Sequence, residues 1–424
     1  MRNVQKSYEI AREVYAELGV DTDAVLRKFD RIPVSIPCWQ GDDVGGFESR
    51  AGGTSGGIMA TGNYPGKPRS VAELRQDMEK AMEYVPGAIK INLHSSYGEN
   101  YEPDVDRDNY APRHFAGWVQ WAKEKGVGLD FNCTTFGHPK AQDGLTISNP
   151  KDDIRKFWVN HMIAARRIAA YMGKELGQAC VYNTWVQDGI KDMPADRMLY
   201  RRLLKDSFDR IFAEKISTDI LYDALEPKLF GIGVESFTVG SNDFYLSYHG
   251  YARANGIGNT IMNLDLGHFH PTEGIADKIS AVMLFSDKVM VHFTRGIRWD
   301  SDHVVINDDQ TNETMREIVR AGVLDNVFFG TDYFDATINR VAAWAIGTRA
   351  TKRALLGAML EPSHLLKKAE SEGDLTTRLA LMDEFRSLPV NAVWEKYCCE
   401  KNVAIGTAWL SDLKQYEKNI MFKR

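Results

Sequence analysis

The chain has few cysteines, no long apolar run and no excess of basic residues, and each absence excludes a class of protein. The five cysteines form no CxxC pair and no disulfide framework, which indicates a reducing compartment, so a cytoplasmic location is expected. No stretch of about 18 apolar residues occurs, which excludes a membrane-spanning helix. Acidic residues outnumber basic ones by 58 to 52 and no Lys/Arg-rich run occurs, so nucleic acid is not an expected partner.

Apolar residues are plentiful: they make up 44% of 424 residues, enough for a large globular core. Eight short apolar or β-branched runs alternate with longer amphipathic stretches, a pattern typical of βα units around a parallel sheet. The runs cover residues 32–39, 89–95, 128–134, 179–185, 220–228, 259–267, 288–295 and 327–334. Apolar residues at helical spacing fill stretches between them, such as 71–85 and 154–176. Eight such units predict an α/β fold, the (β/α)₈ TIM barrel.

A plain barrel needs only about 250 residues, so this chain has surplus length. Its first 20 residues mix charges at helical spacing and predict a surface helix rather than a signal peptide. We expect residues 1–347 to form the barrel with this helix and a long loop after strand one. Residues 348–424 should form a helical extension that packs on the barrel or on a neighbouring subunit. The glycine-rich segment 41–66 does not match a phosphate-binding loop, and we expect it to cover the barrel mouth.

Metal-ligand side chains gather where four consecutive predicted strands end. Glu226, Asp265, His292 and Asp332 end the fifth to eighth runs. In a TIM barrel the carboxyl ends of the strands converge on one mouth, so these side chains should meet. Three more lie just beyond the strands, namely His268, Asp300 and Asp302. A single Asp at a strand end is more often a helix cap, but seven such residues on one edge favour a metal site.

The charges favour two cations. Five carboxylates in one mouth carry −5, and two divalent cations with Lys228 balance them. Oxygen and imidazole ligands favour Mn²⁺, Mg²⁺, Co²⁺ or Zn²⁺ over Ca²⁺, and the sequence does not choose among the four.

Further polar and aromatic residues end other runs. Lys228 follows Glu226 closely and can stabilise charge on a substrate oxygen, although it is also compatible with a surface turn. Trp39 and Trp185 close the first and fourth runs, where they can stack on a sugar or pack in the core. His94 closes the second run, where a substrate contact and a structural role are equally open.

Six long motifs resemble L-rhamnose isomerases over nearly the whole chain. They are PVSIPCWQGDDVGGFE, ATGNYPGK, LFGIGVESFTVGSNDFY, DLGHFHPTE, RWDSDHVV and GTDYFDATINR. The tripeptide Glu226-Pro227-Lys228 is also similar to the metal-ligand and lysine pair of the related xylose isomerases. The resemblance implies reversible conversion of L-rhamnose to L-rhamnulose in rhamnose metabolism, two divalent ions (commonly Mn²⁺) and a homotetramer.

The resemblance also implies roles for individual residues. A structural ion would be held by Glu226, Asp265, His292 and Asp332, and a catalytic ion by His268, Asp300 and Asp302, with Asp265 between them. Lys228 would bind the terminal substrate oxygen, and we assign catalytic roles to Lys228, Asp302 and Asp332. Ile58 and Phe131 are candidates to contact the rhamnose methyl group.

Other mechanisms and functions stay open on the residues alone. The resemblance favours a metal-assisted hydride shift between C1 and C2, with an enediol route as the alternative. A two-metal hydrolase or phosphodiesterase is the rival enzyme, and a sugar-binding protein is the rival outside enzymes. Lys228 beside Glu226 weighs against the first, and the crowd of ligand side chains weighs against the second.

Overall fold

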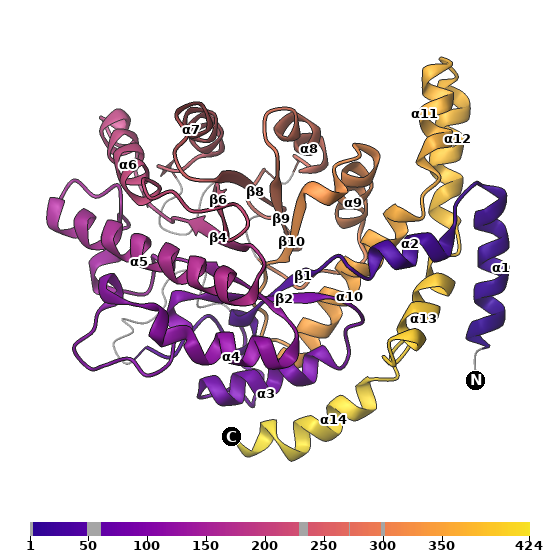
Figure 1. Ribbon diagram of the computed structural model, residues 1–424, viewed down its shortest axis with the longest axis horizontal. Helices are drawn as coiled ribbons and strands as arrows, with labels where there is room; N and C mark the ends of the chain where they lie inside the picture. The colour runs from indigo at the N-terminus through magenta and orange to yellow at the C-terminus, as the bar shows by residue number, and fades with distance from the viewer. Residues whose placement is uncertain (1–2, 49–60, 229–235, 271, 298–301) are drawn as a thin grey trace.

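Eight strands close into a barrel at the centre of the molecule (Figure 1). The computed structural model describes residues 3–48, 61–228, 236–270, 272–297 and 302–424. All neighbouring barrel strands are parallel. Around the barrel they are β1 (Val34–Pro37), β2 (Ile89–His94), β3 (Gly128–Asn132), β4 (Cys180–Trp185), β6 (Leu221–Glu226), β8 (Thr260–Asp265), β9 (Val289–Phe293) and β10 (Val327–Thr331). This arrangement confirms the predicted (β/α)₈ fold.

Each of the eight predicted runs contains one barrel strand, but the strands are shorter than the runs. The run over 32–39 yields β1, and Cys38–Gly41 after it form the short 3₁₀ helix η1. The run over 327–334 yields β10, which ends at Thr331. Side chains just past the strand ends therefore lie on turns at the barrel mouth, where they can point inward.

A helix follows every barrel strand, which gives the chain eight βα units. These helices are α3 (Val71–Met82), α4 (Ala116–Lys125), α5 (Asp152–Leu176), α6 (Arg197–Ile211), α7 (Asn242–Asn255), α8 (Ala276–Met283), α9 (Asp309–Arg320) and α10 (Arg340–Met359). They surround the strands, so the barrel wall is buried on both faces.

Helix α5 shows how the sequence sets these elements. Asp152 and Asp153 place negative charge in its first turn, where the helix dipole favours it. Buried residues such as Trp158, Met162 and Ala165 recur at three- and four-residue spacing and pack on the barrel. Gly177 then ends the helix with φ +64°, a left-handed conformation that glycine adopts without strain. The predicted helix over 154–176 is confirmed.

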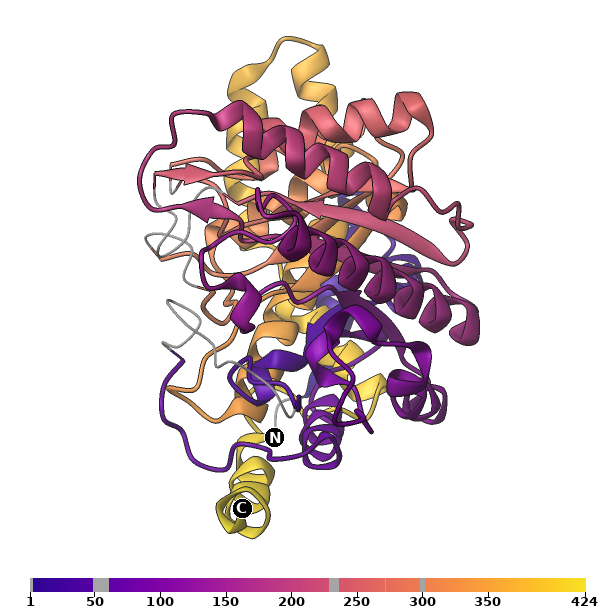
Figure 2. The same cartoon turned by 90° about the vertical axis from the view of Figure 1, so that its left-hand side faces the viewer.

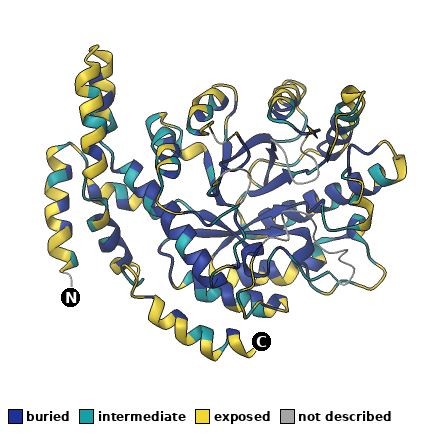
Figure 3. Cartoon of the chain, turned by 180° about the vertical axis from the view of Figure 1, so that it is seen from behind, coloured by how far each residue is buried: buried dark blue, intermediate teal, exposed yellow. Residues whose placement is uncertain are grey.

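In the described part of the chain, six helices lie outside the barrel units. They are α1 (Val4–Glu17), α2 (Thr22–Phe29), α11 (Ser363–Ser371), α12 (Leu375–Glu384), α13 (Val390–Glu400) and α14 (Leu410–Asn419). Helix α1, predicted as a surface helix, packs on α13 (Figure 1). The α11–α12 hairpin projects from the barrel and is largely exposed (Figure 3). Helix α10 crosses the expected boundary at residues 347 and 348 without a break, and the proposed division into two parts stays a prediction.

Two short strands, β5 (Gly189–Ile190) and β7 (Phe237–Thr238), pair antiparallel outside the barrel (Figure 2). At two residues each they are too short for a sequence pattern to indicate, and they were not predicted. The pair joins the connection after β4 to the connection after β6. In the part of the chain that the structure describes, no helix is long and apolar enough to cross a membrane.

Candidate metal centre

The inward-facing side chains of the barrel change from apolar to polar toward the carboxyl ends of the strands. Val181, Ala224, Ile261 and Met290 form a small apolar cluster inside the barrel. Along β8, alternate residues then give the sequence Ile261, Asn263 and Asp265. Because alternate residues of a strand share one face, this order places an amide layer above the apolar cluster and a carboxylate above that.

Four side chains meet at the polar end and form a cluster, which we call the cage. They are Glu226, Asp265, His292 and Asp332, and each offers one ligand atom within 4.8 Å of all the others. His292 Nδ1 lies 3.4 Å from Glu226 Oε1, 3.7 Å from Asp265 Oδ2 and 3.6 Å from Asp332 Oδ2. The structure thus brings together the four residues that end the fifth to eighth runs, in an arrangement that can hold a metal ion.

Each cage carboxylate uses one oxygen for a hydrogen bond and turns the other toward His292. Asn183 Nδ2 donates to Glu226 Oε2. The amide of Gly267 donates to Asp265 Oδ1 at 2.6 Å. Trp39 Nε1 donates to Asp332 Oδ1 at 3.0 Å. The inner oxygens Oε1, Oδ2 and Oδ2 are those that face Nδ1 of His292, so three carboxylates are oriented around one point.

The cage is costly to ionise without a cation. Burial raises the pKa of Asp265 well above its ordinary value, and the charges of Glu226, Asp332 and Asp302 raise it further. Burial also raises the pKa of Asp332. Among the described residues, Asp265 Oδ2 is buried and accepts no hydrogen bond. A divalent cation fits this donor set, because the carboxylate oxygens that face one another would donate their lone pairs to it.

Glu226 and His292 shift each other's pKa within the cage. Burial opposes ionisation of Glu226, but His292, His268 and the hydrogen bond from Asn183 together lower its pKa to about 2. Burial lowers the pKa of His292, but the charge and hydrogen bond of Glu226 together with the charges of Asp332 and Asp130 raise it, so the net shift is upward. A metal ion at the cage would bind the unprotonated imidazole, so metal binding should compete with protonation of His292.

The second predicted set is placed in part. His268 lies in the turn after β8 with Nδ1 3.3 Å from Glu226 Oε1, so Glu226 faces both predicted sites. Asp302 is close enough for its charge to raise the pKa of Asp265. Asp300 lies outside the described residues. The bridging position expected for Asp265 stays a prediction.

Four rings, those of Trp39, His94, Phe136 and Trp185, lie next to one another beside the cage, and we call them the aromatic arc. The rings of Trp39 and His94 are 4.5 Å apart, those of His94 and Phe136 5.6 Å, and those of Phe136 and Trp185 5.6 Å. Lys228 Nζ lies 4.7 Å from the centre of the Trp185 ring. Four of the predicted substrate residues thus lie in or against this arc, namely Trp39, His94, Trp185 and Lys228. Phe136 was missed, although an aromatic residue four positions past the end of β3 was a usable signal.

The imidazole of His94 is neutral in the aromatic arc. Burial lowers its pKa to about 3, and its Nδ1 lies 3.0 Å from Thr134 Oγ1. A neutral imidazole offers one donor and one acceptor.

The interpretation of Phe131 as a residue of the mouth is corrected. Its fully buried ring packs edge-on against Phe115 at 4.9 Å, next to α4 and outside the barrel. The next residue, Asn132, takes the inward position and bonds to Asn92. Ile58 lies outside the described residues.

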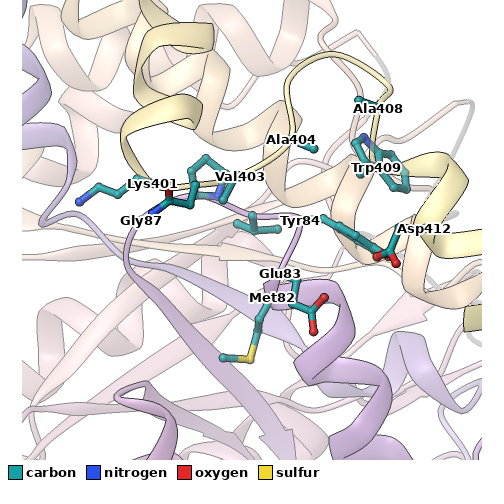
Figure 4. Close-up of a pocket in the computed structure, with 13 residues that line it drawn as sticks. Met82, Glu83, Tyr84, Gly87, Lys401, Val403, Ala404, Ala408, Trp409 and Asp412 are labelled. Carbon is teal, nitrogen blue, oxygen red and sulfur yellow. The ribbon is translucent and has the colours of Figure 1, made fainter.

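A cavity of about 570 Å³ lies at the other end of the barrel (Figure 4). It is lined by residues 82–87, which lead into β2, and by residues of the extension such as Lys401, Trp409 and Asp412. Its lining lacks the cluster of carboxylates and imidazoles found in the cage. The candidate metal ligands therefore lie at the mouth and not at this cavity.

Comparisons with known proteins identify the family of the chain. The L-rhamnose isomerase (RhaA) family matches residues 2–424. The L-rhamnose isomerases of Salmonella gallinarum and Citrobacter koseri are each 50% identical over 421 residues, which is 99% of both chains. A solved putative xylose isomerase from Rhodospirillum rubrum is 11% identical, with a TM-score of 0.45 over 76% of this chain and 98% of its own. The chain belongs to the L-rhamnose isomerase family, whose members are aldose–ketose isomerases.

Proposed function

We propose that the protein interconverts L-rhamnose and L-rhamnulose in rhamnose metabolism and depends on divalent metal ions to do so. One observation carries the metal dependence: three carboxylates of the cage each turn one oxygen toward His292 Nδ1. Membership of the family supports the substrate, since the similar proteins are named for it.

Two ions are proposed. Glu226, Asp265, His292 and Asp332 would hold the structural ion, and His268, Asp300 and Asp302 the catalytic one. Mn²⁺ is the preferred metal, with Zn²⁺, Co²⁺ or Mg²⁺ as alternatives, because the ligands are oxygens and imidazoles. The homotetramer and the cytoplasmic location expected from the sequence stay predictions.

The reaction transfers one hydrogen between carbons and one proton between oxygens. In a hydride shift, the C2–H bond breaks and its hydrogen moves with both electrons to C1, while the proton of the C2 hydroxyl moves to O1. Divalent ions would polarise the sugar carbonyl and stabilise the charge on the oxygens. The protein must therefore bind the sugar with C1 and C2 next to the cage.

Residues around the cage suit this task. Lys228 lies two residues after Glu226 and rests on Trp185, so its charge can be held near the terminal sugar oxygen. The neutral imidazole of His94 can donate a hydrogen bond to a sugar hydroxyl or accept one from it, and it does not repel a cation. The rings of Trp39, Phe136 and Trp185 provide an apolar surface that excludes water from the reacting carbons.

The activity test uses the purified protein stripped of metal and reloaded with Mn²⁺. It is incubated with L-rhamnose and a panel of other aldoses, and ketose formation is measured. We expect L-rhamnulose from L-rhamnose and little product without metal. No ketose from any aldose would refute the proposal.

The mechanism is tested with L-rhamnose deuterated at C2. A hydride shift keeps the deuterium on C1 of the ketose, because the hydrogen never exchanges with solvent. Complete loss of the label to water would exclude the hydride shift as the main route and favour an enediol.

A further inference from the structure

Four asparagines face the inside of the barrel directly below the cage, and we call them the amide row. They are Asn92 on β2, Asn132 on β3, Asn183 on β4 and Asn263 on β8. None is more than 3% exposed. Buried amides need hydrogen-bond partners, so the contacts of the row determine how each side chain is turned.

The amides of the row bond to one another in a single direction. Asn263 Nδ2 donates to Asn183 Oδ1 at 3.1 Å, and Asn183 Nδ2 donates to Asn132 Oδ1 at 2.9 Å. Asn132 Nδ2 in turn donates to Asn92 Oδ1 at 2.6 Å. On β6, which separates β4 from β8, the residue opposite Asn183 is Ala224, whose methyl group leaves room for the contact from Asn263.

Asn183 is the member that connects the row to a carboxylate of the cage. One of its amide hydrogens goes to Asn132 and the other to Glu226 Oε2. Its oxygen accepts from Asn263, so donors and acceptor are all used and the amide has one satisfied orientation. The other oxygen of Glu226, Oε1, then faces His292 Nδ1 at 3.4 Å and His268 Nδ1 at 3.3 Å.

We propose that Asn183 is a positioning residue that holds Oε2 of Glu226, so that Glu226 offers only Oε1 to a metal. The proposal rests on the proposed function, because it assumes that the cage binds a cation. Hydrogen bonds to metal-ligating carboxylates fix their orientation, and losing such a partner typically weakens metal binding about 10- to 100-fold.

A role in stability alone predicts a different result. If the row served only to satisfy buried amides, removing any member would destabilise the protein to a similar degree and leave metal affinity unchanged. Asn92 provides the matched control, because it is as buried as Asn183 and accepts from Asn132, but among the described residues it makes no hydrogen bond to the cage.

The experiment compares Asn183→Leu, Asn92→Leu and Glu226→Gln with the parent chain. The dissociation constant for Mn²⁺ is measured by competition with a chelator, and thermal unfolding in excess chelator measures the stability of the metal-free protein. Asn183→Leu should weaken Mn²⁺ binding about 10- to 100-fold, and Asn92→Leu should leave it within about threefold of the parent.

The outcomes separate the two proposals. If Glu226→Gln binds Mn²⁺ as the parent does, the cage is not the Mn²⁺ site and the metal dependence argued from it in the proposed function is wrong. If Glu226→Gln loses binding while Asn183→Leu keeps it, only the positioning role is overturned. Equal losses in Asn183→Leu and Asn92→Leu also overturn it.

Asn183→Ala is the second variant if Asn183→Leu does not fold. Its smaller side chain leaves space for a water that can donate to Oε2, so an intermediate loss of affinity is expected. If neither variant unfolds cooperatively, Asn183 acts in folding and the positioning role is rejected.

Discussion

Trp39 Nε1 donates to Asp332 Oδ1 at 3.0 Å, and this bond joins the turn after β1 to the turn after β10. The two residues are 293 positions apart in the chain. Trp39 was expected to contact substrate, and the structure adds a bond to a cage carboxylate. Because Oδ1 is held by the indole, Oδ2 is the oxygen that faces His292.

Trp39→Phe should weaken metal binding while keeping an aromatic ring in the arc. The indole donor is lost and Asp332 is free to rotate, so we expect the affinity for Mn²⁺ to fall about tenfold. The dissociation constant is measured by chelator competition. Trp121→Phe is the matched control, since Trp121 Nε1 on α4 donates at 2.8 Å to Glu79 Oε1 on α3, between two helices outside the barrel strands. It should lower stability by about 1 kcal/mol and leave affinity unchanged.

Asp332→Asn should have opposite effects on the metal-free and the metal-loaded protein. Burial raises the pKa of Asp332, so the ionised carboxylate opposes folding when no cation is present. The amide removes that charge, and the melting temperature in chelator should stay the same or rise. With Mn²⁺ the parent should melt higher than the variant, because the variant has lost a ligand. A variant stabilised by Mn²⁺ as strongly as the parent would remove Asp332 from the ligand set.

The barrel and the cage were predictable because strand ends meet. In a closed parallel barrel, residues far apart in sequence converge at the carboxyl ends, so the ends of four runs sufficed to bring Glu226, Asp265, His292 and Asp332 together. That argument needs only the order of the strands and their direction. It does not need the exact ends of the strands, which a sequence pattern leaves open by about 2 to 4 residues.

The orientation of side chains was less predictable. Phe131 and Asn132 are adjacent in β3, and both are buried, Phe131 beneath the helices and Asn132 inside the barrel. Because both faces of the barrel wall are buried, the alternation of apolar and polar residues along a strand does not show which residue points inward. The hydrogen bonds of Asn183, Gly267 and Trp39 to the outer oxygens of the cage depend on distances of a few tenths of an ångström. No sequence pattern carries that information.

Lys352 should make stability depend on pH independently of metal. It lies in α10, fully buried, and its Nζ donates to Ala88 O at 2.7 Å. Burial lowers its pKa from 10.5 to about 7. Between these values the unfolded chain binds a proton that the folded protein does not, so stability rises as pH rises from about 7 to 10 and is flat below 7.

The measurement is chemical unfolding of the chelated protein across this pH range, with Lys352→Met as the variant. Methionine carries no charge, so the slope due to Lys352 should disappear. Lys123→Met is the control, because Lys123 is partly exposed and pairs with Glu175, and neither group is among those that shift the pKa of Lys352. An unchanged slope in Lys352→Met would show that another group titrates.

Gly330→Ala tests whether His292 is confined by the neighbouring strand β10, where Gly330 pairs with it. A Cβ at Gly330 would lie 2.8 Å from Cδ2 and 3.2 Å from Nε2 of His292, so the imidazole must move. We expect Mn²⁺ affinity to fall by about tenfold or more and stability in chelator to fall by about 1 to 3 kcal/mol.

The control is Gly357→Ala, in which the atoms nearest to the added Cβ are methyl groups of Val390 at 3.6 and 3.7 Å, an ordinary contact distance. That control, inside α10, should bind Mn²⁺ as the parent does and gain up to about 1 kcal/mol of stability. Because both variants add one methyl group, a loss of affinity confined to Gly330→Ala reports the position of the His292 ring and not a general effect of crowding. Parent-like affinity in Gly330→Ala would mean that the ring of His292 is not held where the cage requires it.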